Sequence, residues 1–181
     1  MKEDIRTSWP SDAQESPFPA NMSWYSFKKG ILDPKCWQLF AIVVQQTNCI
    51  GTWPAGLARA VSEELPYVCP YRRRDRSSLW KFAAEGSRPD PGTIEVYGPD
   101  LLPHDDEVAS TVLPKYGPMV VNFHAQWELG PAGKYNRIPC PAKHGGEDSE
   151  QNRLRWFRKC LSLLIMHLAA NRDLTSVAFP F

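Results

Sequence analysis

The stretch VVQQTNCIGTWPAGLARAV, residues 43–61, decides which fold this sequence predicts. Its β-branched apolar residues give way to polar ones, a short loop with glycine and proline follows, and a helical pattern then begins. A strand, a glycine loop and a helix N-terminus in this order bring backbone N–H groups together, and such groups bind anions, most often phosphate or diphosphate. The stretch therefore predicts an anion-binding turn after a buried strand.

Strands and helices are predicted to alternate along the rest of the chain. Strands are expected at residues 24–28, 40–47, 93–97, 119–123 and 175–181, and helices at residues 33–39, 55–65 and about 149–170. In the last helix the expected apolar stripe is Leu154, Phe157, Leu161, Leu164 and Leu168, with Arg153, Arg155, Arg158 and Lys159 outside it. This alternation favours an α/β sandwich around a largely parallel or mixed sheet.

Size and composition fit one globular domain. The chain has 181 residues, of which 43% are hydrophobic and 23% charged, and its formal net charge is +1. This balance gives no global electrostatic reason to expect nucleic acid as a partner. Residues 1–21 are polar and rich in proline, so we expect a flexible lead-in to a domain at residues 22–181.

No membrane span is expected, because no apolar run approaches the roughly 20 residues that a spanning helix needs. The chain begins with the charged residues Met1-Lys2-Glu3-Asp4 and has no apolar signal region, which favours an intracellular protein. Five scattered cysteines without a C-x-x-C pair predict reduced, mostly buried thiols rather than a zinc site or a disulfide framework. Neither a metal nor a cofactor is expected.

Candidate site residues lie where strands end, since ligands of open α/β sheets bind beyond the carboxyl ends of the strands. Asn48 ends the first buried strand, and its amide could bind sugar hydroxyls or could simply form a turn. Gly51 and Gly56 either close the turn or allow the backbone to approach a diphosphate. Trp53 is a stacking platform or a lid on the core.

Other candidate residues follow elsewhere in the chain. His124 and Gln126, near the end of a later strand, have acid–base or positioning roles, or structural ones. The run Arg72, Arg73, Arg74 and Arg76 is a solvated helical face or turn, or else one or two of these arginines reach a bound phosphate. The loop matches neither the G-x-G-x-x-G fingerprint nor a Walker loop, and the chain has no G-x-S-x-G.

The sequence Asn48-Cys49-x-Gly51-Thr52-Trp53-Pro54-Ala55-Gly56-Leu57-Ala58 resembles the macrodomain signature N-C-x-G-[ST]-W-G-[AG]-G-[IL]-A. The most similar group is the ADP-ribose 1''-phosphate phosphatase-like branch. Residues 25–32 are similar to the opening strand and Lys-Gly turn of this family, residues 120–126 to a later strand, and residues 155–181 to the final long helix and the strand ending in Ala-Phe-Pro. The resemblance covers about residues 24–181.

This resemblance implies a three-layer α/β/α sandwich with a mixed, largely parallel sheet, which binds ADP-ribose or a derivative. Asn48 would contact the distal ribose, and the loop of residues 51–56 would surround the diphosphate. If the chain hydrolyses ADP-ribose 1''-phosphate or an ADP-ribose ester, the catalytic residues are expected to be Asn48 and His124. The implied ligand-binding set is Ile31, Gln45, Asn48, Gly51, Thr52, Trp53, Ala55, Gly56 and Gln126.

The sequence departs from the family pattern at three places. Ile31 stands where an Asp or Asn usually selects adenine, Pro54 replaces a loop glycine and removes one backbone donor, and the sequence ends at Phe181, before the usual second phosphate loop and last helix. One alternative is therefore an inactive scaffold or interaction module, in which a second copy or a partner chain covers the C-terminal edge. Another is a cleft that serves a different small molecule, lined by His124, Gln126 and Trp53.

Overall fold

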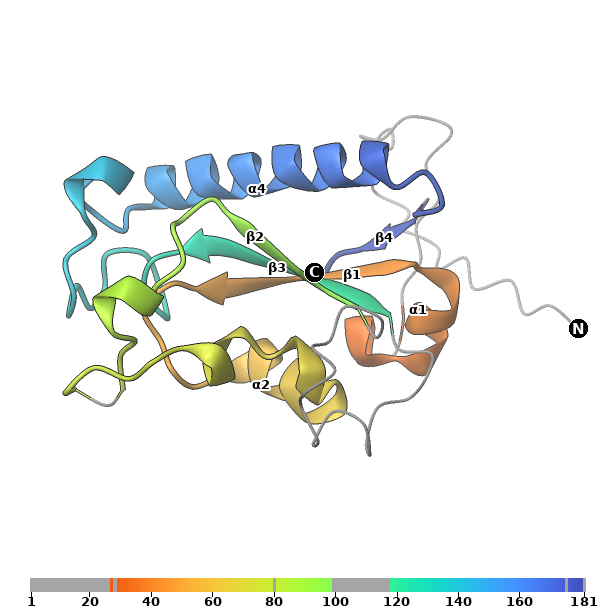
Figure 1. Ribbon diagram of the computed structural model, residues 1–181, viewed down its shortest axis with the longest axis horizontal. Helices are drawn as coiled ribbons and strands as arrows, with labels where there is room; N and C mark the ends of the chain where they lie inside the picture. The colour runs from red at the N-terminus through yellow and green to blue at the C-terminus, as the bar shows by residue number, and fades with distance from the viewer. Residues whose placement is uncertain (1–26, 28, 80, 99–117, 175, 181) are drawn as a thin grey trace, which may run out of the picture.

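The computed structural model describes residues 27, 29–79, 81–98, 118–174 and 176–180 (Figure 1). The main elements are α1 (Pro34–Leu39), β1 (Ile42–Asn48), α2 (Gly56–Glu64), β2 (Ile94–Tyr97), β3 (Met119–Gln126), α4 (Glu150–Ala170) and β4 (Val177–Ala178). Short 3-10 helices connect them: η1 (Gly30–Leu32), η2 (Pro66–Val68), η3 (Pro70–Arg73), η4 (Glu85–Ser87) and η6 (Ala142–His144). Of the expected strand at residues 24–28, only Phe27 lies within the described residues.

The described strands form a mixed sheet in the order β2-β3-β1-β4. Strand β1 runs parallel to β3 and β4, whereas β2 is antiparallel to β3. The β1–β3 register pairs Ile42 with Met119, and it slips after Thr47 so that Asn48 lies opposite Gln126. The prediction of an α/β fold with a mixed sheet is confirmed, and β3 extends beyond its expected end at Phe123.

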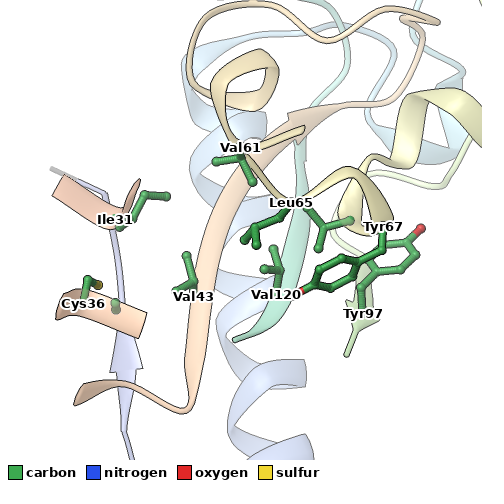
Figure 2. Close-up of a cluster of buried hydrophobic side chains, with 10 residues drawn as sticks. Ile31, Cys36, Val43, Val61, Leu65, Tyr67, Tyr97 and Val120 are labelled. Atoms are coloured by element: carbon green, nitrogen blue, oxygen red, sulfur yellow. The ribbon is translucent and has the colours of Figure 1, made fainter. Parts of the chain in front are cut away.

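Helices lie on both faces of this sheet: α4 runs along one face, and α1 and α2 lie against the other (Figure 1). Side chains alternate along a strand, so β1 directs Val43 to the α1–α2 face and Val44 to the α4 face. Figure 2 shows the first of these two cores, where Val43 and Val120 meet Val61 and Leu65. Farther along β1, the α1–α2 face carries polar side chains instead of apolar ones.

Capping residues set where two of the helices begin. Asp33 caps α1 by accepting a hydrogen bond from Lys35 N at 3.0 Å, and Pro34 occupies the first helical position. Ser149 caps α4 by accepting from Asn152 N at 3.3 Å. Helix α2 differs, because its N-cap residue is Ala55, and no side chain caps it.

The expected apolar stripe of α4 is confirmed for its C-terminal part and wrong at its first turn. Leu164 is buried against the sheet, whereas Leu154 is 50% exposed and Trp156 takes the inward position. Arg153, expected on the outside, has a side chain only 15% exposed because it pairs with Asp148. The first turn of α4 faces the buried polar segment around Asp148 rather than the sheet, so a charged side chain faces inward there.

All five cysteines are buried and free of disulfides, as predicted. Cys36, Cys160 and Cys69 lie in three different core clusters, and Cys49 and Cys140 share a fourth. Burial raises the pKa of Cys140 to about 11 and that of Cys160 to about 12. These thiols are therefore poor nucleophiles in the folded protein. In the described part of the chain, no helix has the length and apolar character needed to span a bilayer.

Candidate functional site

Asn48 closes the turn that follows β1. Its side chain is 5% exposed; Oδ1 accepts a hydrogen bond from Gly51 N at 2.6 Å, and Nδ2 donates to the Tyr71 hydroxyl at 3.2 Å. A Cβ atom at Gly51 would lie 2.7 Å from Asn48 Oδ1, so only glycine fits there. Of the two roles that the sequence left open for Asn48, the structure therefore shows the turn-forming one.

Arg74 supports the same turn from inside the protein. Its NH1 donates to the carbonyl oxygens of Asn48 and Gly51, both at 2.8 Å, and its guanidinium lies 4.7 Å from the centre of the Tyr71 ring. Burial lowers the pKa of Arg74. The interpretation of the arginine run as a solvated face is wrong for this residue, which is 7% exposed. Nothing in the run of arginines distinguishes Arg74 from its neighbours, so the sequence gives no signal for this role.

The outer rim of the loop is open to solvent. Thr52 is buried, but Trp53 is 53% exposed. The Arg76 guanidinium lies 4.6 Å from the centre of the Trp53 ring. Ala55 and Gly56 are exposed, and Gly56 has a φ of +54°, which favours glycine. The uncapped N-terminus of α2 thus lies beside an exposed cation and an exposed aromatic ring.

Other residues expected at the site are enclosed. Ile31 is 4% exposed and belongs to the core under α1 and α2. Gln45 has no exposed surface, and its Nε2 donates to Asn122 Oδ1 at 2.6 Å. A ligand could reach either side chain only after a rearrangement of the fold. Gln126 is half-buried, and its Oε1 accepts from Gln46 Nε2 and Arg153 NH1, both at 3.4 Å.

His124 lies in a chain of polar groups on the α1–α2 face of the sheet. Its Nδ1 is 2.9 Å from Thr47 Oγ1, and its Nε2 is 3.5 Å from Glu95 Oε2, too poorly aligned for a hydrogen bond. A hydroxyl, an imidazole and a carboxylate in this order occur in nucleophilic enzymes. However, Thr47 and His124 have no exposed surface, so this hydroxyl cannot meet a substrate. Only Glu95 reaches solvent, with 39% of its side chain exposed.

Glu95 borders a polar cleft that the sequence did not reveal. The cleft has a volume of about 510 Å³ and lies between η3, η4 and β2. Its charged and polar lining consists of Arg73, Arg74, Ser87, Arg88, Glu95 and Tyr97. These residues come from three separate segments, and no spacing within any one segment indicates that they meet.

A second hollow, of about 280 Å³, is apolar and lies beside β1 on the α4 face. Phe123, Phe157, Leu161 and Phe179 contribute to its lining. Strand β4 pairs only with Ile42 and Val43, so within the described residues the rest of that edge of β1 has no neighbouring strand. An apolar surface at this edge is what we expect under the alternative in which a second copy or a partner chain covers the C-terminal edge.

Comparisons with known proteins give no match. No family model, no curated protein and no solved structure is similar enough to assign the chain to a family. Within the described residues, no group of three or more histidine, cysteine, aspartate or glutamate side chains could hold a metal ion. The functional argument therefore depends on the geometry described above.

The Glu95 carboxylate is expected to contribute to stability only above acidic pH. Burial tends to raise its pKa, but the nearby His124, the hydrogen bond from Tyr97 and the charge of Arg74 outweigh burial and lower it. A carboxylate whose pKa is lowered on folding stabilises the protein above its unfolded pKa of about 4.3, and the effect is lost as the pH falls below that value. Urea unfolding at about pH 6 and about pH 3.5 should show that Glu95→Gln loses less stability than the wild type on acidification. Equal losses would contradict this expectation.

Proposed function

We propose that this chain is a macrodomain-like protein that binds ADP-ribose or a close derivative at the loop of residues 51–56. The observation that carries the proposal is the uncapped, solvent-facing N-terminus of α2, which follows the central strand β1 and lies beside Trp53 and Arg76. The choice of ADP-ribose among anionic ligands depends on the resemblance of residues 48–58 to the macrodomain signature.

Each part of the rim matches one part of such a ligand. The positive end of the helix dipole and the Arg76 guanidinium both attract a diphosphate. The exposed indole of Trp53 offers a face on which a base or a ribose can stack. Pro54 has no N–H group, so the backbone donors that the N-terminus of α2 offers would be those at Ala55 and Gly56.

The proposal concerns binding rather than hydrolysis. Asn48, the first expected catalytic residue, uses its amide to hold Gly51 and Tyr71. His124, the second, has no exposed surface. Hydrolysis of ADP-ribose 1''-phosphate or of an ester would require both side chains to leave their present contacts, whereas binding at the rim requires neither to move.

Titration calorimetry with ADP-ribose tests the proposal. Arg76→Gln is expected to weaken binding about tenfold, since loss of one charged contact to a phosphate costs about 1.4 kcal/mol. Arg72→Gln is the matched control: Arg72 is also exposed and lies near Arg76 in the chain, but it has no contact with the loop in the described structure. The affinity of the Arg72→Gln variant for ADP-ribose should change by less than about twofold.

Two outcomes would contradict the proposal. The first is the absence of heat at millimolar ADP-ribose with a protein that circular dichroism shows to be folded. The second is an equal loss of affinity in Arg72→Gln and Arg76→Gln, which would indicate general attraction between opposite charges rather than a site at the loop.

A further inference from the structure

We propose that the cleft between η3, η4 and β2 binds a small phosphorylated sugar. The cleft, here called the arginine cleft, is lined by Arg73, Arg74, Ser87, Arg88, Glu95 and Tyr97 together with their neighbours. It is separate from the loop of residues 51–56, because Arg74 lies between them: its NH1 bonds to the loop carbonyls while the residue also lines the cleft. The site therefore goes beyond the function proposed above.

The charges of the arginine cleft favour an anion. Three guanidinium groups face one carboxylate, and the lining has no other ionised side chain. Arg88 is held in place by the hydrogen bond from its Nε to Ala83 O at 2.9 Å, and within the described residues its two terminal nitrogens have no partner. Arg73 is held by its contact with the Tyr97 ring, 4.8 Å from the guanidinium carbon to the ring centre. Both arginines thus keep donors for a phosphate.

Two further polar groups of the lining, one of them buried, also have unused hydrogen-bonding capacity. Arg74 is 7% exposed, and its NH2 has no partner among the described residues. A buried charged donor without a partner is costly, and sites of this kind are typical where a ligand or water completes the bonding. The Ser87 hydroxyl accepts a hydrogen bond from Asp75 N at 2.8 Å, which leaves its own hydrogen available to donate.

Glu95 determines what the rest of the ligand must be. Its Oε2 accepts from the Tyr97 hydroxyl at 2.8 Å and is near His124, whereas Oε1 has no partner among the described residues. A carboxylate repels phosphate but accepts hydrogen bonds from hydroxyl groups. The ligand must therefore carry a phosphate at one end and hydroxyl groups at the other.

The volume of the arginine cleft and the position of the Tyr97 ring further limit the class of ligand. A volume of about 510 Å³ lies within the range of small-molecule sites, about 300–1,000 Å³. Tyr97 is the aromatic side chain of the lining, but it is only 8% exposed, in contrast to Trp53 at the loop, and Arg73 lies over its ring, so the cleft offers no free face on which a nucleobase could stack. A phosphorylated sugar meets these requirements, whereas a nucleotide leaves its base without a partner.

Calorimetry with ribose 5-phosphate as the probe tests this proposal, with inorganic phosphate and ribose as comparison ligands. Ribose 5-phosphate should bind about tenfold more tightly than inorganic phosphate, because its sugar hydroxyls can donate to Glu95 while its phosphate stays at the arginines, and ribose at about 10 mM should give no heat. Arg73→Gln should weaken binding of ribose 5-phosphate by about tenfold or more. The adjacent Arg72→Gln removes the same charge outside the cleft, and its effect should be less than about twofold.

Several results would overturn the proposal. They are no heat from ribose 5-phosphate at about 10 mM, inorganic phosphate binding as tightly as the sugar phosphate, or equal losses in the Arg72 and Arg73 variants. Unfolding in urea should give the same midpoint for Arg73→Gln and Arg72→Gln. Equal midpoints show that a weaker affinity of Arg73→Gln does not result from unfolding of the variant.

The variant Arg76→Gln separates this site from the loop. We expect it to leave the affinity for ribose 5-phosphate unchanged, while Arg73→Gln leaves the affinity for ADP-ribose unchanged. A loss of ribose 5-phosphate binding in Arg76→Gln would indicate that this ligand binds at the loop, and it would contradict the proposal that it binds in the arginine cleft. Failure of ADP-ribose to bind would contradict the function proposed above and leave the result with ribose 5-phosphate intact.

Discussion

Replacing Arg153 by leucine should lower the free energy of unfolding by about 3–5 kcal/mol, the usual cost of leaving one partner of a buried ion pair alone. Arg153 Nε and NH2 bind the two oxygens of Asp148 at 2.7 and 2.6 Å. Its NH2 and NH1 also donate to the carbonyl oxygens of Glu128 and Gly130, at 3.0 and 2.6 Å. Asp148 is 7% exposed, so the leucine variant would leave a buried carboxylate without its counter-charge.

The effect should extend to the segment after β3. Asp148 also accepts hydrogen bonds from the backbone N–H groups of Trp127 and Glu128, at 3.3 and 3.0 Å. Urea unfolding measures the loss of stability, and Arg155→Leu is the control. Arg155 is an exposed arginine of the same helix, and its NH2 donates a hydrogen bond to His144 O at 2.7 Å. The free energy of unfolding of Arg155→Leu should fall by no more than about 1 kcal/mol. A loss below about 1 kcal/mol in Arg153→Leu would show that the pair does not stabilise the fold.

Arg74→Leu should lower the free energy of unfolding by about 2–3 kcal/mol. Two buried carbonyl oxygens, those of Asn48 and Gly51, would lose their shared donor, and each unpaired group costs about 1–3 kcal/mol. The cost is partly offset, because leucine also removes a buried guanidinium whose NH2 has no partner among the described residues. Since two groups are left unpaired and only one is relieved, destabilisation should prevail.

Urea unfolding of Arg74→Leu and Arg72→Leu tests this estimate. The two residues lie on either side of Arg73, but Arg72 is exposed and makes no hydrogen bond within the described structure, so its variant should change stability by less than about 0.5 kcal/mol. Equal stabilities of the two variants would mean that the loop carbonyls find other partners when Arg74 is absent.

Local sequence patterns predicted most of the elements. The apolar run before Asn48, the helical pattern of residues 55–65, and the spacing of Leu161, Leu164 and Leu168 all depend on neighbours close in the chain. Their elements appear at nearly the expected positions, with α2 at Gly56–Glu64 and α4 beginning at Glu150. Such features need no knowledge of distant contacts, which explains why the sequence was sufficient.

The arrangement of side chains around the candidate sites could not be predicted in this way. Arg74 is buried because Asn48 and Gly51 present carbonyl oxygens to it, a contact across 26 and 23 residues of sequence. His124 and Gln45 lie within strands whose ends looked accessible, but 3-10 segments after α2 cover that face: Asn122 Nδ2 donates to Val68 O at 3.0 Å. The arginine cleft likewise forms only when η3, η4 and β2 come together.

The distribution of the five buried cysteines has a practical consequence for studying motion in this protein. Among the described residues, each of the four core clusters contains at least one thiol: Cys36 belongs to α1, Cys160 belongs to α4, Cys69 packs beside Ala58 of α2, and Cys49 lies with Cys140 beyond the end of the sheet. A thiol reagent can react only after the cluster around a given cysteine opens. Rates of labelling at individual cysteines would therefore give the free energy of opening of each cluster separately, from local fluctuation to global unfolding, in the unmodified chain.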